Sequence, residues 1–186
     1  MIAIADTCFI IDWSTYRRRD EIFKIFELVL IPEQVLSEVI SENTIAWISH
    51  ALAMGKFHLY TPTPDILNEA DSIVRASYSN PQMKKLETPE ALCIAIAKRH
   101  GYIVLTENRG AYMFVEYFDE YREVKLWRAL ELLKELLKRR IITASHRGDI
   151  EAIFIEYQED TKHIFPRRDL EEAINEVSAC IMQIEN

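Results

Sequence analysis

The stretch Ile2-Ala3-Ile4-Ala5-Asp6-Thr7 decides the fold. Its short apolar run is too short for a helix and fits a strand buried on both faces, and Asp6 and Thr7 place polar groups directly after that strand. Runs of the same character return further along the chain, at residues 28–31, 57–60, 102–106 and 124–127. The sequence therefore predicts about five strands.

The segments between these strands have helical spacing. Apolar residues recur every three or four positions, as at Ile66, Ala70 and Ile73. Several helix starts are marked by a proline followed by an acid, as at Thr88-Pro89-Glu90. Strands that alternate with helices imply crossover connections, which place the helices on both faces of a parallel sheet. We expect an α/β fold: a three-layer α/β/α sandwich with a mainly parallel, about five-stranded sheet and a helical C-terminal extension.

Length and composition favour a single domain. The chain has 186 residues, of which 49% are hydrophobic, and shows no linker or repeat. No apolar run approaches the roughly 20 residues of a membrane span, so we expect a cytoplasmic protein without a membrane partner. The three cysteines lack metal-site spacing and are interpreted as free thiols.

The formal charge of −8 opposes unspecific coating of nucleic acid. Basic clusters at residues 17–19, 138–140 and 167–168 could meet phosphate, but solvated helix faces are the commoner role of such runs. The five histidines form no metal-binding pattern and are interpreted as surface or capping residues. Aromatic residues at 112–118 are interpreted as packing groups rather than as a surface for stacking bases.

Acidic residues follow the predicted strands. Asp6 ends the first strand, Glu107 and Asn108 follow the run 102–106, Glu38 lies after the second strand, and Glu90 opens a helix. The carboxyl ends of parallel strands meet at one edge, so these side chains are expected to converge there. Mg²⁺ and Mn²⁺ prefer such oxygen ligands and can activate water for phosphodiester cleavage.

Each acid also has a purely structural interpretation. A glutamate in the first turn of a helix is favoured by the helix dipole, which alone can account for Glu38 or Glu90. Glu107 is an ordinary turn residue when it is judged singly. Asp6 is harder to dismiss, because a carboxylate that ends a buried strand must find partners or face a cleft.

Four segments together resemble the PIN-domain family, including the VapC-type toxins. They are Asp6-Thr7-Cys8-Phe9-Ile10, Ile31-Pro32-Glu33-Gln34-Val35-Leu36-Ser37-Glu38-Val39, Pro89-Glu90-Ala91-Leu92-Cys93-Ile94-Ala95-Ile96-Ala97 and Ile103-Val104-Leu105-Thr106-Glu107-Asn108-Arg109. The resemblance implies a metal-dependent nuclease domain over residues 1–140, with residues 141–186 as a helical C-terminal extension packed on the same domain.

The resemblance also implies a site and partners. Asp6, Glu38 and Glu90 would bind Mg²⁺ or Mn²⁺, with Glu107 or Asn108 completing the catalytic set. The substrate would be RNA, cleaved internally, and the chain would form a homodimer. If it is the toxin of a toxin–antitoxin pair, an antitoxin protein would be a further partner.

One departure from the family pattern leaves alternatives open. The family often has aspartate where this chain has Asn108, and Glu107 stands beside it. Glu107 could serve as the fourth ligand, Asn108 could orient a water, or the chain could be a catalytically silent module that binds protein or RNA. A phosphatase of the haloacid dehalogenase type fits less well, because Cys8 stands where that class needs a second aspartate.

Overall fold

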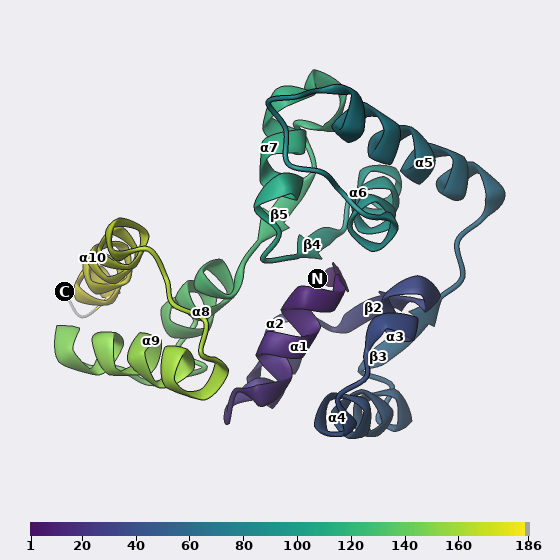
Figure 1. Cartoon of the computed structure of the whole chain (residues 1–186). Helices are drawn as coiled ribbons and strands as arrows, with labels where there is room; N and C mark the ends of the chain where they lie inside the picture. The colour runs from purple at the N-terminus through teal and green to yellow at the C-terminus, as the bar shows by residue number, and fades with distance from the viewer. Residues whose placement is uncertain (185–186) are drawn as a thin grey trace.

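The structure is a computed structural model that describes residues 1–184. Its strands form one parallel sheet in the order β3-β2-β1-β4-β5 (Figure 1). Their bounds are Ile2–Ala5 (β1), Leu28–Pro32 (β2), Phe57–Tyr60 (β3), Ile103–Leu105 (β4) and Lys125–Trp127 (β5). The predicted fold class, a three-layer α/β/α sandwich with a five-stranded parallel sheet and a helical C-terminal extension, is confirmed.

Helices connect all the strands. They are α1 (Thr7–Thr15), η1 (Arg19–Glu21), α2 (Ile22–Ile25), α3 (Glu33–Glu38), α4 (Glu42–Ala53), α5 (Pro64–Ser79), α6 (Thr88–His100), α7 (Arg109–Tyr117), η2 (Asp119–Tyr121), α8 (Ala129–Lys138), α9 (Arg147–Thr161) and α10 (Arg167–Ile184). Helix α6 packs on β1, β2 and β4 and contacts α5 and α7, whereas α1 contacts α4 and α2 contacts α8. None of the described helices combines the length and apolar character needed to cross a membrane.

The first strand is buried because it lies in the middle of the sheet. Ala3 pairs with Val29 of β2 on one side and with Ile103 of β4 on the other, and all three side chains are buried. Strand β4 is shorter than the sequence predicts: Tyr102 and Thr106 flank it. Thr106 nevertheless continues the ladder, since its amide donates to the carbonyl of Trp127 at 3.0 Å.

The strand order places a topological switch point between β1 and β4. From β1 the chain proceeds through β2 to β3 on one side of the sheet, and from β4 it proceeds to β5 on the other. In open α/β sheets, ligands bind in the crevice beyond the carboxyl ends of the strands at such a point. The residues that follow these two strands are Asp6 and Thr106.

The C-terminal helices pack beside α8 and α1 (Figure 1). Tyr157 of α9 is fully buried, with its ring centroid 5.6 Å from that of Trp13 and 5.2 Å from that of Tyr16. Leu133 and Leu136 of α8 are also fully buried. Residues 141–184 thus complete the hydrophobic core on this side of the molecule.

Two of the basic clusters form ion pairs with the C-terminal helices, although Arg17 and Arg18 keep 58% and 41% of their side-chain surface exposed. Arg17 donates to Asp160, and Arg18 donates to Glu156, so these cations bind acids of α9. Lys138 likewise donates to Glu176 of α10. These cationic groups are therefore used to hold the C-terminal helices.

Candidate active site

Asp6 lies at the end of β1, next to the switch point, and is buried with 1% of its surface exposed. It also caps α1, where its Oδ1 accepts the amide of Phe9 at 2.9 Å. The hydroxyl of Thr106 donates to its Oδ2, and the Cys8 thiol lies 3.1 Å from Oδ1. Burial raises the pKa of Asp6 to about 6, against the lowering effect of these hydrogen bonds. Its carboxylate is therefore poorly solvated and would be stabilised by a nearby cation.

Thr106 links Asp6 to Asn108. The backbone amide of Asn108 donates to Thr106 Oγ1 at 3.0 Å, so one hydroxyl accepts from the turn after β4 and donates to Asp6. The Asn108 side chain caps α7 by accepting the amide of Gly110 at 2.8 Å. Its amide nitrogen points the other way and donates to Glu90 Oε1 at 2.9 Å.

Glu90 and Glu38 reach this edge from separate helices. Glu90 stands in the first turn of α6, where its second oxygen accepts the amide of Glu87 at 3.2 Å. Its negative charge contributes to the raised pKa of Asp6. Glu38 ends α3, is exposed, and accepts the hydroxyl of Thr7 at 2.6 Å. Since Thr7 follows Asp6 directly, this bond holds Glu38 beside the same edge.

We call Asp6, Glu38, Glu90 and Asn108 the acidic edge. The structure joins them through Thr7, Thr106 and direct hydrogen bonds. Within residues 1–184, no group of three or more His, Cys, Asp or Glu side chains is gathered closely enough to hold an ion. The oxygens of Asp6, Glu38 and Glu90 nevertheless belong to carboxylates, a ligand type that Mg²⁺ and Mn²⁺ prefer.

The structure does not bring Glu107 to the acidic edge. Its Oε1 accepts the amide of Ala129 at the start of α8, at 2.6 Å, and its Oε2 lies 3.4 Å from His163 Nε2. Burial raises the pKa of Glu107 to about 7, against the lowering effects of the Ala129 amide and of His163. Glu107 and Asn108 thus face opposite sides of the turn between β4 and α7.

No protein-family model matches the chain, and a search of curated proteins gives no significant match. Among solved structures, the chain is similar to VapBC2 from Rickettsia felis bound to a DNA fragment from their promoter. The identity is 12%, the TM-score is 0.46, and the match covers 69% of this chain and 98% of that chain. At this level of similarity, the activity of the chain has to be inferred from its own residues.

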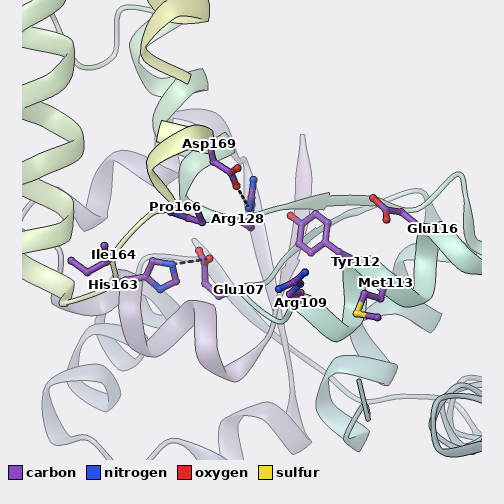
Figure 2. A pocket seen from close by; sticks show the side chains of 10 residues that line it. All are labelled: Glu107, Arg109, Tyr112, Met113, Glu116, Arg128, His163, Ile164, Pro166 and Asp169. Carbon is purple, nitrogen blue, oxygen red and sulfur yellow. Dashed lines mark hydrogen bonds and ion pairs between the residues drawn. The ribbon is translucent and has the colours of Figure 1, made fainter. Parts of the chain in front are cut away.

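A cavity of about 650 Å³ lies on the Glu107 side of the β4–α7 turn. Figure 2 shows Glu107 facing His163, with Arg128 paired to Asp169 and Tyr112 beside them. The other residues that line it come from α7 and from the segment before α10: Arg109, Met113, Glu116, Ile164 and Pro166. We call this cavity the Glu107 pocket.

The interpretation of the histidines as surface or capping residues is wrong for His163. Its Nδ1 lies 3.0 Å from Asp12 Oδ2 of α1, and its Nε2 faces Glu107. The hydrogen bond with Asp12 raises the pKa of His163. Asp12 and His163 are 151 positions apart in the chain, and no local pattern marks either of them. Only the packing of the C-terminal helices brings them together.

Proposed function

We propose that the chain is a metal-dependent endoribonuclease that hydrolyses RNA phosphodiester bonds at the acidic edge with Mg²⁺ or Mn²⁺. The observation that carries this proposal is the position of Asp6. It is a fully buried carboxylate at the topological switch point, near a second carboxylate, Glu90. Burying a carboxylate at the end of a strand costs free energy, so a residue with a purely structural role would not be expected to be a desolvated acid with a raised pKa.

The residues of this edge divide into ligands and groups that orient them. Asp6, Glu38 and Glu90 would hold the cation, whose chemistry is to activate water and to neutralise charge on the phosphate. Thr106 fixes the rotamer of Asp6, and Thr7 does the same for Glu38. Asn108 holds Glu90 and is neutral, so the edge carries three carboxylates rather than four.

RNA as the substrate, a homodimer and an antitoxin partner are supported by the resemblance of the sequence segments to the PIN-domain family, and we retain them as proposals. Light scattering at high protein concentration tests the dimer, which a purely monomeric protein would contradict. Copurification with the product of a neighbouring gene tests the antitoxin.

The activity is tested by incubating the purified protein with mixed RNAs and Mn²⁺. We expect cleavage by the wild type and a loss of at least a hundredfold in Asp6→Asn. Glu123→Gln serves as the matched control, because Glu123 is an exposed acid that precedes β5 at the opposite edge of the sheet. Equal cleavage by wild type and Asp6→Asn, or none over a broad set of RNAs, would argue against a nuclease.

A second function, a catalytically silent interaction module, is favoured by one observation. Every carboxylate of the acidic edge already accepts a hydrogen bond from the protein itself, and Asn108 replaces a fourth acid. The two functions differ in their response to metal. A cation that binds only the folded state raises its stability, so the absence of stabilisation at millimolar Mn²⁺ would favour the silent module.

A further inference from the structure

The Glu107 pocket and the acidic edge lie on opposite sides of the turn between β4 and α7. Glu107 and Asn108 are consecutive, and they face the pocket and the acidic edge respectively. Arg109 follows them and lines the pocket as the first residue of α7. The turn that carries Glu107 and Asn108 therefore separates a ligand in the pocket from the acidic edge.

Arg109 differs from the other arginine of the pocket. Arg128 is occupied, since it donates to Glu131 and to Asp169. Among the described residues, the exposed guanidinium of Arg109 has no hydrogen bond or ion pair. An unpaired arginine at the mouth of a cavity is available for a phosphate, with which it forms charge-assisted hydrogen bonds.

Tyr112 supplies a second unused group. Its hydroxyl is buried and has no hydrogen-bond partner within residues 1–184. The guanidinium of Arg128 lies 5.5 Å from the centre of its ring, and Figure 2 shows the hydroxyl pointing toward Arg128. A buried hydroxyl without a partner costs stability unless a ligand or water completes it.

The remaining wall is apolar. Met113 and Pro166 line the pocket, and Ile164 does so with 73% of its surface exposed. Carboxylates are present as well, at Glu107 and Glu116, so the pocket does not suit a simple anion. It suits a ligand with a flat, hydrogen-bonding ring at one end and a phosphate at the other. A cavity of about 650 Å³ is within the usual range for small-molecule sites.

We propose that the Glu107 pocket binds one nucleotide of a single-stranded RNA, with the base against Met113 and the phosphate on Arg109. The assignment to RNA rests on the proposed ribonuclease function. Splayed bases of single strands are commonly bound in this way, by a flat apolar surface and hydrogen bonds to the base edge. The C-terminal extension forms part of the same pocket, because it supplies Ile164 and Pro166.

The test uses the full chain with ¹³C-labelled methionine and isoleucine methyl groups and no added divalent metal. The probes are the four ribonucleoside 5′-monophosphates and, separately, inorganic phosphate. We expect at least one nucleotide to shift the Met113 methyl signal saturably. The signals of Met54 and Ile40, which are exposed outside the pocket, should stay in place.

Variants identify the groups that bind. Arg109→Gln should weaken nucleotide binding at least tenfold, and Tyr112→Phe should weaken it severalfold while keeping the ring. Arg99→Gln is the matched control, since Arg99 is an exposed arginine near the C-terminal end of α6 and does not line the pocket. The nucleotide affinity of Arg99→Gln should equal that of the wild type.

Three results would overturn the proposal: no shift with any nucleotide, equal shifts and affinity with inorganic phosphate alone, or unchanged affinity in Arg109→Gln. Because no divalent metal is present, these results do not depend on cleavage. A protein that binds nucleotides but cuts no RNA would contradict the ribonuclease and leave the pocket standing. Cleavage without nucleotide binding at Met113 would contradict the pocket proposal and leave the ribonuclease proposal standing.

Discussion

Asn108 donates its side-chain amide to Glu90 Oε1 at 2.9 Å, which joins the turn after β4 to the first turn of α6. The neutral amide occupies the position at which the sequence resemblance leads us to expect an aspartate. It therefore removes one negative charge from the acidic edge and replaces charge repulsion with a hydrogen bond.

Asn108→Asp should make the edge bind Mn²⁺ more tightly while lowering stability without metal. Two facing carboxylates repel, which costs about 1–2 kcal/mol in the metal-free state. A tenfold gain in metal affinity adds about 1.4 kcal/mol of stabilisation when the metal is in excess. Thermal unfolding with and without millimolar Mn²⁺ measures both effects. In the double variant Glu90→Gln/Asn108→Asp, the loss of stability without metal should disappear, because the two carboxylates no longer face each other. If Mn²⁺ stabilises Asn108→Asp no more than it stabilises wild type, the acidic edge is not a cation site.

Thr106→Val should destabilise the fold by about 1–3 kcal/mol, because it leaves polar partners at a buried position without their hydrogen bonds. Thr106 donates to Asp6 and accepts the amide of Asn108, and only 1% of it is exposed. Thr106→Ser keeps the hydroxyl and should lose less stability than Thr106→Val. Urea unfolding of the three proteins checks this, and equal losses in the Val and Ser variants would mean that the hydroxyl contributes nothing.

The sheet and the acidic edge were predictable because their signals are local. The run from Ile2 to Ala5 shows a buried strand in its own composition, and Asp6 is placed at its end by adjacency alone. Glu90 is marked by the helix start at Thr88 and Pro89. In a parallel sheet, strand ends converge whatever the strand order, so the convergence could be expected before the order was known.

The Glu107 pocket could not be predicted in this way. Its charge contacts join distant positions, as where His163 meets Glu107 and Asp12. The direction of the Glu107 side chain was also hidden, since it depends on the free amide of Ala129 at the start of α8. The ion pairs of Arg17 and Arg18 with α9 were missed for the same reason. Sequence spacing predicts which face of a helix or strand is buried, but not which distant segment packs against that face.

The contact between Arg17 and Asp160 should make the attachment of α9 sensitive to acid. The hydrogen bond from Arg17 lowers the pKa of Asp160 below its ordinary value. A carboxyl whose pKa is lower in the folded state stabilises that state above its unfolded pKa, and this contribution is lost as pH falls through the folded pKa. Asp160→Asn should therefore be less stable than wild type at pH 7, by less than about 1 kcal/mol for so exposed a partner.

This difference should shrink as the pH is lowered toward 2, because Asp160 is progressively protonated in both states. Urea midpoints of wild type and Asp160→Asn at the two pH values measure it. Glu159→Gln, at an exposed neighbouring position, should match wild type at both. A difference of the same size at pH 7 and pH 2 would show that the charge of Asp160 is not its cause.

Tyr157→Ala should cost about 3–5 kcal/mol, as expected for removal of a fully buried aromatic ring. The ring lies between Trp13 and Tyr16 of the first helical region and stacks on Phe165, with a centroid distance of 5.4 Å and an interplanar angle of 13°. Tyr157→Phe keeps these contacts and should cost under about 1 kcal/mol. Because Trp13 lies against Tyr157, tryptophan fluorescence during urea unfolding reports on the same contact. We expect Tyr157→Ala to unfold in one cooperative transition at a lower urea concentration than wild type. If residues 141–184 were only loosely attached, the variant would instead shift the fluorescence of Trp13 without lowering the global unfolding midpoint.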